Sequence, residues 1–257
     1  MAIVDASIRF DRIADTYDDT RGGEERGIRF ATAMMPLLDP DAPLLEVGVG
    51  TGTVAQAFAA FGFRVIGVDL SEPMLRHARA RIGPTVVAGD AAMLPVRSGS
   101  FRQTVSTWVL HLVADVPAVL NEVARVLTPG GRYLVIPGRM RPTDDPIGRV
   151  KAMMAEALAA DRARRARVEP EALRESAPTA GLEVVDVIDL ESYEVGVSAD
   201  EEARRLEERS YSGLWDIDAE TWARVVEPAI AALRALPEDQ RHATHQVVDS
   251  CIVLEKR

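Results

Sequence analysis

The residues with the clearest chemical potential are three glycines that follow a short apolar run. Gly48, Gly50 and Gly52 alternate with other residues, and Asp69 comes 21 positions after Gly48. Glycine lets the backbone approach a ligand closely, and the helix after such a turn aims its first N–H groups at that ligand. An acid at the end of the next strand can accept hydrogen bonds from both hydroxyls of a ribose. The combination predicts a site for an adenosine-type cofactor.

Two details distinguish between cofactors that carry an adenosine. A dinucleotide site requires a third glycine three residues after the second, and Thr53 occupies that position. Glu46, directly before the turn, would repel a pyrophosphate, yet it could orient waters or the ammonium of an amino-acid group. Both details favour S-adenosylmethionine over NAD. An NAD-dependent oxidoreductase therefore stays as a weaker alternative.

Strand and helix patterns alternate around these residues. Ser71 is placed to cap the helix that follows Asp69. Strands buried in a parallel sheet appear as short apolar runs, and helices cover both faces of such a sheet, so the alternation predicts a doubly wound α/β fold. We expect strands over residues 44–47, 64–68, 85–88, 105–108 and 132–136, and helices over residues 53–61, 72–81 and 116–127.

The two ends of the chain depart from this alternation. Residues 5–38 show helical spacing of apolar side chains with a break at the glycine pair 22–23, and residues 199–236 are expected to be wholly helical. Residues 182–193 and 244–255 alternate like strands. Since helical sequence separates them, we expect an antiparallel pair with a helical insertion between its strands. Two further helices are expected over residues 146–168 and 171–180.

Composition argues against several classes of partner. The formal net charge of −10 disfavours a nucleic-acid partner, because a phosphate backbone attracts basic proteins. No apolar stretch approaches the roughly 20 residues of a membrane span, and the first ten residues lack the apolar core of a signal peptide, so we expect a cytoplasmic protein with no membrane partner. The single cysteine, Cys251, allows no intrachain disulfide. His242 and His245 would point to opposite faces of a strand, so no metal site is expected.

Four segments, in this order, give the chain a family resemblance. They are Leu44–Gly52, Val65–Ser71, Gly89–Ala91 and Leu120–Val135. Together they resemble the class I methyltransferases, and most closely the ubiquinone/menaquinone-biosynthesis type of small-molecule methyltransferase, over residues 7–137. The resemblance implies S-adenosyl-L-methionine as cofactor. It also implies a Rossmann-like sheet of seven strands that is mostly parallel, with an antiparallel strand at the end.

The resemblance further implies where each part of the cofactor would bind. Glu46 and the glycine turn would line the methionine end, and Asp69 would hold the ribose hydroxyls. Asp90 would bond the adenine amino group, and the N–H of Ala91 would meet the adenine ring. The full set of expected cofactor residues is Tyr17, Glu46, Gly48, Val49, Gly50, Thr51, Gly52, Asp69, Leu70, Met74, Gly89, Asp90, Ala91, Thr107 and Trp108.

Two residues are candidates for roles next to the cofactor. Tyr17 is placed like the family's N-terminal lid tyrosine, and an ordinary helix contact is the alternative. Methyl transfer needs a base only where the acceptor must lose a proton, and His111 is the best candidate because it follows the fourth strand at the carboxyl edge of the sheet. A structural histidine is the alternative there. The chain departs from the family at Arg102, which concerns surface charge, and at Leu112, where a second histidine is common; the latter weakens histidine-based chemistry.

Aromatic residues of the later chain could wall an apolar substrate pocket. Tyr193, Tyr211 and Trp215 are the candidates, and the alternative is that they fill the core of the insertion together with Trp222. The arginines between residues 162 and 167 are flanked by acids, which is typical of a solvated helix face.

These patterns predict one methyltransferase domain over residues 1–257. Within it, residues 1–40 would form a helical lid, 41–137 the cofactor-binding core, 138–181 a helical segment and 199–236 a substrate cap. The expected reaction moves the methyl group of S-adenosylmethionine to an oxygen or carbon, less readily a nitrogen, of a small apolar molecule by in-line displacement. A cofactor-binding protein of the same fold, reused for a non-methylating role, is the main alternative.

Overall fold

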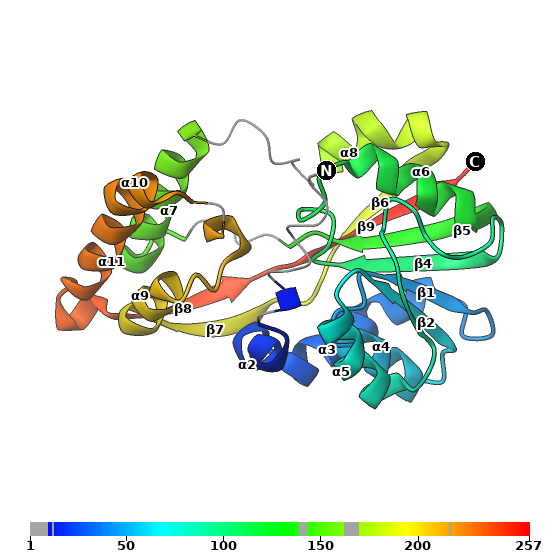
Figure 1. Cartoon of the computed structure of the whole chain (residues 1–257), viewed down its shortest axis with the longest axis horizontal. Coiled ribbons are helices and arrows are strands. Elements are labelled where there is room, and N and C mark those ends of the chain that lie inside the picture. The colour runs from blue at the N-terminus through cyan, green and yellow to red at the C-terminus, as the bar shows by residue number, and fades with distance from the viewer. Residues whose placement is uncertain (1–9, 12, 139–142, 162–169, 216) are drawn as a thin grey trace. The chain divides into compact units, whose positions relative to one another are not determined.

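The computed structural model of the chain contains two compact units (Figure 1). The structure describes residues 10–11, 13–138, 143–161, 170–215 and 217–257. The first unit comprises Met1–Gly138, Ala166–Leu190 and Asp249–Arg257, and the second comprises Arg139–Arg165 and Glu191–Val248. The arginine-rich end of the helix expected over residues 146–168, and the first nine residues of the expected lid, lie outside the described residues.

A seven-stranded sheet forms the centre of the first unit. Its strand order is β3-β2-β1-β4-β5-β9-β6. The first five strands along the chain pair in parallel, while β9 is antiparallel to both β5 and β6. The expected doubly wound, mostly parallel sheet with an antiparallel terminal strand is therefore confirmed. The strands are β1 (Leu44–Val47), β2 (Val65–Asp69), β3 (Val86–Ala88), β4 (Phe101–Thr107), β5 (Leu127–Ile136), β6 (Leu182–Asp189) and β9 (Ser250–Lys256).

Helices cover both faces of this sheet, because its strands carry apolar side chains on both. Along β5, Tyr133 and Val135 join one hydrophobic core, and Leu134 and Ile136 join the other. In Figure 1, α6 and α8 lie on one side of the sheet, and α3, α4 and α5 lie on the opposite side. The helices of this unit are α2 (Tyr17–Arg21), α3 (Gly23–Met34), α4 (Thr53–Ala60), α5 (Glu72–Ile82), α6 (Val116–Val126) and α8 (Pro170–Ser176), which a 3₁₀ turn, Ala177–Ala180, follows.

Local signals place the helix ends that surround the expected site. Gly22, with φ of 78°, separates α2 from α3, which confirms the expected break. Ser71 caps α5, since its hydroxyl accepts the N–H of Met74 at 3.3 Å. Asp115 caps α6 in the same way, through the N–H of Ala118 at 2.9 Å. Each cap satisfies one of the N–H groups that a helix start leaves without a partner.

The second unit combines helices with a two-stranded antiparallel sheet. Residues 199–236 are not wholly helical, as had been expected. Arg209 takes a left-handed backbone with φ of 51° after α9, and only a 3₁₀ turn, Ser212–Leu214, precedes the next helix. That helix begins after Asp218, whose carboxylate accepts the N–H of Thr221. The helices are α7 (Pro146–Asp161), α9 (Ala199–Glu207), α10 (Ala219–Thr221), a π-helical turn (Trp222–Val226) and α11 (Glu227–Arg234), and the strands are β7 (Tyr193–Ser198) and β8 (His242–Val247).

The two expected long strands are each divided in two. The pairing is antiparallel as expected, but β6 ends at Asp189 before β7 begins, and β8 ends at Val247 before β9 begins. At the interruption, the N–H of Leu190 donates to the carbonyl oxygen of Asp249 at 2.8 Å. No glycine or proline marks either interruption, since residues 190–192 are Leu-Glu-Ser and residues 248–249 are Val-Asp, so the usual sequence signals of a strand end do not reveal them.

Two further properties concern ligands and membranes. In the described parts of the chain, no helix combines the length and apolar character needed to cross a membrane.

His242 is exposed on β8 whereas His245 is half-buried, and His245 lies 2.7 Å from a carboxylate oxygen of Asp145. Across the same residues, no three histidine, cysteine or acidic side chains are grouped so that they could hold a metal ion.

Candidate functional site

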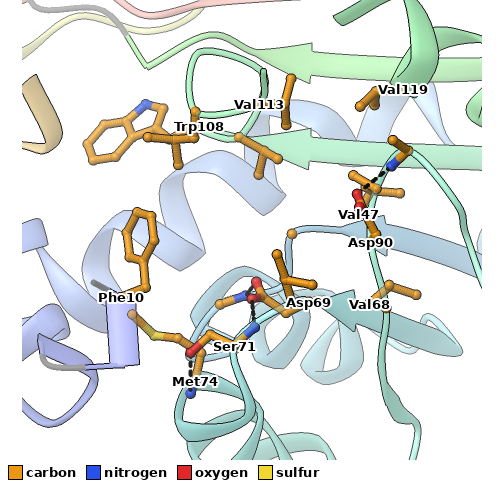
Figure 2. A pocket seen from close by; sticks show the side chains of 18 of the residues that line it. Phe10, Val47, Val68, Asp69, Ser71, Met74, Asp90, Trp108, Val113 and Val119 are labelled. Carbon is orange, nitrogen blue, oxygen red and sulfur yellow. Dashed lines mark hydrogen bonds between the residues drawn. The ribbon is translucent and has the colours of Figure 1, made fainter. Parts of the chain in front are cut away.

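A cavity of about 200 Å³ lies at the carboxyl ends of the parallel strands of the first unit (Figure 2). In a doubly wound fold this edge of the sheet is where ligands bind. All of its lining residues belong to the first unit. They are Phe10, Tyr17, Val47, Gly48, Gly50, Val68, Asp69, Leu70, Ser71, Met74, Gly89, Asp90, Ala91, Ala92, Thr107, Trp108, Val109, Leu112, Val113, Ala114, Asp115 and Val119.

The glycine turn between β1 and α4 forms one wall of the cavity. Gly48 has φ of 77°, and a Cβ placed there would lie 2.2 Å from Cγ2 of Val109. A side chain at this position would therefore force the loop after β4 away from the turn. Gly50 has φ of 54° and open space beside its Cα, so its backbone faces the cavity without obstruction.

Asp69 is held rigidly where β2 ends. One of its carboxylate oxygens accepts the N–H of Gly50 at 2.8 Å, and the other accepts the N–H of Ser71 at 2.9 Å (Figure 2). Removal from water raises the pKa of this carboxyl, and the two N–H donors oppose that rise. The carboxylate thus joins the glycine turn to β2 at the edge of the cavity, where it keeps lone pairs for a ligand hydroxyl.

Asp90 occupies the corresponding place after β3. Its Oδ1 accepts the N–H of Ala92 at 2.8 Å, which turns the backbone so that Ala91 lines the cavity. Gly89 makes this turn possible, because a Cβ there would lie 2.6 Å from Cδ of Pro95. Asp69 at the end of β2 and Asp90 after β3 thus lie at the ends of adjacent strands.

Glu46 is buried beside the turn, with only 1% of its surface exposed. Burial raises its pKa from 4.5 to about 8; the negative charge of Asp69 adds to the rise, and the guanidinium of Arg26 opposes it. Its Oε2 has no hydrogen-bond partner among the described residues. A buried carboxyl group with a free oxygen next to a cavity is a binding-site candidate in its own right.

Trp108 closes the cavity at the end of β4. It takes a left-handed backbone with φ of 57°, which is strained for a bulky side chain. Its backbone N–H donates to the carbonyl oxygen of Ile136 at 2.8 Å. The indole packs edge-on against Phe30 at 5.7 Å between ring centroids. Within the described part of the chain its Nε1–H, although buried, makes no hydrogen bond. Such strain is concentrated at functional sites in many proteins.

The N-terminal segment contributes two rings to the cavity, those of Phe10 and Tyr17. Their centroids are 6.1 Å apart with the rings edge to face. Polar contacts attach this segment to the core. The hydroxyl of Ser71 donates to Asp11 at 2.6 Å, and the hydroxyl of Thr51 donates to Asp18 at 2.6 Å. Arg81 also donates to Asp18 at 2.7 Å. In the view of Figure 2, Phe10 and Trp108 lie at the same end of the cavity.

Most of the residues expected to bind the cofactor line this cavity, and five candidates do not: Glu46, Val49, Thr51, Gly52 and His111. Glu46 is buried beside the turn, as described above, and the other four make contacts that hold them elsewhere. Val49 packs against Gly67, Thr51 is engaged by Asp18, and a Cβ on Gly52 would lie 2.9 Å from the Cα of Ala78 in α5. His111 lies against Gly138, where a Cβ would approach its Cε1 to 2.6 Å.

The candidate substrate residues belong to the second unit. The hydroxyl of Tyr211 donates to both carboxylate oxygens of Glu202, at 2.9 and 2.7 Å. The indole N–H of Trp215 donates to the carbonyl oxygen of Arg209 at 2.8 Å, and Tyr193 begins β7. None of the three lines the cavity. The contacts of Tyr211 and Trp215 agree with the alternative in which they belong to the insertion's own core.

Sequence reasoning missed several of the lining residues. The sequence predicts Ser71 only as a helix cap, and Phe10 has no predicted role in the site. Val109, Leu112 and Val113 follow Trp108 in an apolar run, which was the available signal. An apolar run after a strand predicts burial, but it does not tell a cavity wall from a core.

Comparison with known proteins agrees with this geometry. Residues 45–135 match the family model described as a methyltransferase domain. A demethylmenaquinone methyltransferase of Thermobifida fusca is 37% identical over 141 residues, which cover 51% of this chain and 60% of the relative. The chain thus matches less than two thirds of the length of that curated relative.

Solved structures show the same fold at low sequence identity. A possible histamine N-methyltransferase of Thermotoga maritima superposes with a TM-score of 0.57 at 19% identity, covering 98% of this chain and 99% of that one. The cyclase SpnF superposes with a TM-score of 0.59 at 20% identity, covering 98% and 95%. The matched segment contains β1 to β5 and the acids after β2 and β3. Residues 45–135 of the chain are therefore similar to a methyltransferase domain, and the chain shares the fold of these solved structures.

Proposed function

We propose that this chain transfers the methyl group of S-adenosylmethionine to an oxygen or carbon of a small, apolar molecule. One observation carries the proposal. A single cavity is lined by the glycine turn after β1, by Asp69 after β2 and by Asp90 after β3, within a segment that matches a methyltransferase domain. A nitrogen acceptor is less favoured, by analogy with the relatives alone.

The residues present fit such a cofactor. The carboxylate of Asp69 would hold the ribose hydroxyls, and Asp90 with the N–H of Ala91 would hold the adenine. Glu46, whose buried Oε2 has no partner among the described residues, would meet the ammonium of the methionine end. The cofactor, when bound, supplies a methyl group that its sulfonium already activates. An NAD site is disfavoured, because Thr53 stands at the third glycine position and Glu46 would repel a pyrophosphate.

The task of the protein is then to orient the acceptor and to exclude water. The apolar side chains of Val109, Leu112 and Val113, with the rings of Phe10 and Trp108, provide a dry wall for this purpose. A catalytic role for His111 stays a prediction. Since its ring is not part of the cavity lining, we favour acceptors that need no histidine base, such as an ionised hydroxyl or an activated ring carbon.

The relatives suggest where to begin the search for the acceptor. The curated relative from Thermobifida fusca is named for demethylmenaquinone, so hydroquinones of this type, the reduced and nucleophilic form of such quinones, are the first acceptors to test. A small-molecule partner, no nucleic acid and a cytoplasmic location complete the proposal. The lid role of residues 1–40 and the cap role of residues 199–236 belong to it as well.

Calorimetric titration with S-adenosylmethionine, S-adenosylhomocysteine and NAD tests the cofactor. We expect micromolar binding of the two sulfur nucleosides, its loss in Asp69→Ala, and none for NAD. Incubation with methyl-labelled cofactor and a panel of hydroquinones, kept reduced, and phenols then tests transfer. Binding without transfer to any acceptor would favour the alternative of a reused, non-methylating protein, whereas a folded protein that binds neither sulfur nucleoside would contradict the proposal.

A further inference from the structure

Arg125 and Glu122 form an ion pair on α6, and we refer to them as the α6 pair. Nε and Nη2 of Arg125 donate to different carboxylate oxygens of Glu122, both at 2.8 Å. Such a two-point contact between a guanidinium and a carboxylate is stronger and better oriented than a single hydrogen bond. The hydrogen bond to Arg125 lowers the pKa of Glu122, so this carboxylate is ionised at neutral pH. Neither side chain lines the cavity.

The α6 pair binds the backbone of the loop that follows β3. The guanidinium donates to the carbonyl oxygens of Val96 and Leu94, both at 2.9 Å, and to Oγ of Ser98 at 3.1 Å. In the other direction, Oε2 of Glu122 accepts the N–H of Leu94 at 2.7 Å. All five N–H donors of Arg125 are therefore used, and Leu94 is bound at both its N–H and its carbonyl oxygen.

The sheet alone gives this loop little support. β3 is three residues long and stands at the edge of the sheet, so it pairs with a neighbour on one side only. A segment next to so few backbone hydrogen bonds opens locally at low cost in free energy. Asp90 and Ala91, which line the cavity, belong to this segment. A second anchor, outside the sheet, is needed to keep them in place.

Two contacts connect the residues bound by the α6 pair to the cavity wall. The N–H of Met93 donates to the carbonyl oxygen of Asp90 at 2.9 Å, so the turn at Asp90 ends one residue before Leu94. Pro95 packs so closely on Gly89 that a Cβ there would lie 2.6 Å from its Cδ. Leu94 is itself buried in the hydrophobic core that α6 helps to form. A shift of Leu94 would therefore displace the backbone on both sides of Asp90.

We propose that Arg125 and Glu122 position the loop after β3 so that it can recognise the base of the cofactor. They are positioning residues, because they act through Asp90 and Ala91 rather than by touching a ligand. The inference rests on the proposed function, in which these two residues hold the adenine, and deepens it. A hydrogen-bonding group fixed in place rejects a base with the opposite pattern of donors and acceptors, whereas a mobile loop adapts to both.

Titration with two nucleosides measures this discrimination. S-adenosylhomocysteine carries a 6-amino group, and S-inosylhomocysteine carries a 6-oxo group in its place. We expect the wild-type chain to prefer the first by about 10- to 100-fold, because Asp90 would otherwise face an acceptor instead of a donor. In Arg125→Met we expect the preference to fall to about threefold or less, since the loop is no longer fixed. A loss of stability alone lowers both apparent affinities equally and leaves their ratio unchanged.

Further variants make this result specific. Asp90→Asn removes the proposed acceptor and should lose the preference although the α6 pair is intact. Arg125→Lys keeps the charge but has at most three donors in place of five, so it should keep an intermediate preference. Arg97→Met is the matched control, because Arg97 is exposed in the same loop, and it should change neither affinity.

An unchanged preference in Arg125→Met would overturn the positioning role, and so would equal binding of both nucleosides by the wild type. If the wild-type chain binds no sulfur nucleoside, the proposed function fails, and amide hydrogen exchange decides separately whether the α6 pair holds the loop. Exchange at Ala92, Met93 and Leu94 should be at least about tenfold faster in Arg125→Met, with the N–H of Leu75 in α5 as an unchanged reference. Equal exchange rates in variant and wild type would contradict the role.

Discussion

Among the described residues, each unit buries one glutamate, and the two carboxyl groups differ in almost every other respect. Glu46 in the first unit is 1% exposed, has an unpartnered Oε2 within the described residues, and has a pKa raised to about 8. Glu202 in the second unit is 2% exposed. It accepts hydrogen bonds from Tyr211 and lies 2.6 Å from Nζ of Lys151 and 3.1 Å from Nη1 of Arg205.

The difference in partners reverses the direction of the pKa shift. Burial alone would raise the pKa of Glu202, but the charge of Lys151 and the surrounding hydrogen bonds outweigh it, so the pKa is lowered. A carboxylate whose oxygens are all paired in this way stabilises the fold. Glu46, by contrast, keeps a buried oxygen without a hydrogen-bond partner among the described residues, and so do Nη1 of Arg26 and the indole N–H of Trp108. Buried polar groups without hydrogen-bond partners around one cavity indicate a ligand-binding site.

Removing the charge of Glu202 should produce the largest effect on stability. In Glu202→Gln, Lys151 and Arg205 lose the partner of a mostly buried ion pair, so we expect a loss of about 3 kcal/mol in the free energy of unfolding. Urea unfolding monitored by circular dichroism measures this. Glu201→Gln is the matched control, because Glu201 is 42% exposed and should contribute under about 1 kcal/mol. A loss below that value in Glu202→Gln would show that the cluster is not what holds this unit together.

Whereas Glu202→Gln should lower the free energy of unfolding, Glu46→Gln should raise it at neutral pH. The folded protein keeps a proton on Glu46 up to about pH 8, whereas the unfolded chain releases it near pH 4.5. The free energy of unfolding therefore falls as pH rises between these values, by as much as about 1.4 kcal/mol per pH unit. Glutamine cannot titrate, so the variant should match the wild type at pH 5 and exceed it by roughly 2 kcal/mol at pH 7.

Urea unfolding at pH 5, 6, 7 and 8 tests this window. Parallel stability profiles for wild type and Glu46→Gln would contradict it. Glu202 provides the internal contrast. Its folded pKa is lowered, so its contribution is present above the unfolded pKa near 4.5 and is lost only as the pH falls further. The same variant should also weaken binding of S-adenosylhomocysteine, whose ammonium Glu46 is proposed to meet.

Sequence predicted the first unit better than the second, for a physical reason. Strands buried in a parallel sheet must be continuous apolar runs, and the turns between them need glycines, caps and acids at fixed places. The turn at Gly48, the cap at Ser71 and the acid at Asp69 carry that information locally. In the second unit, α9 is followed by the left-handed backbone at Arg209. The guanidinium of Arg209 donates to the carbonyl oxygens of Leu214 and Ile217 in the segment that follows. Contacts between separate segments do not appear in a periodic pattern.

The site itself shows the same limit. Gly48 and Asp69 were predictable from the residues, because a ligand-facing role is tied to a local backbone turn, whereas Asp90 came from the family resemblance. Arg26 was not predictable, because it stands in a charged helix whose sequence is typical of a solvated surface. Its burial depends on the approach of Gly27 to α4, which follows from packing.

Tyrosine variants sharpen the comparison at a smaller scale. The hydroxyl of Tyr211 donates to a buried carboxylate, so Tyr211→Phe should lower the free energy of unfolding by about 1.5 kcal/mol. Tyr17→Phe removes a hydroxyl at the cavity in the other unit, and we expect a change within about 0.5 kcal/mol. Both values come from urea titration under one set of conditions. Equal losses in the free energy of unfolding would mean that the hydroxyl of Tyr17 at the cavity contributes as much to stability as that of Tyr211 in the Glu202 cluster.

Removing a helix cap should have the smallest effect on the free energy of unfolding. It also shows whether the difference between Glu46 and Glu202 comes from the two units as a whole or from the groups around these two residues. Asp115 caps α6 through the N–H of Ala118, and Asp218 caps α10 through the N–H of Thr221. Alanine at either position should cost about 1 kcal/mol, since each removes the partner of one N–H at a helix start. Unequal losses in thermal or urea unfolding would trace the contrast to a general difference in rigidity between the units. Equal losses would trace it to Glu46 and Arg26 themselves. Because Asp115 also lines the cavity, only its variant should change the affinity for S-adenosylhomocysteine.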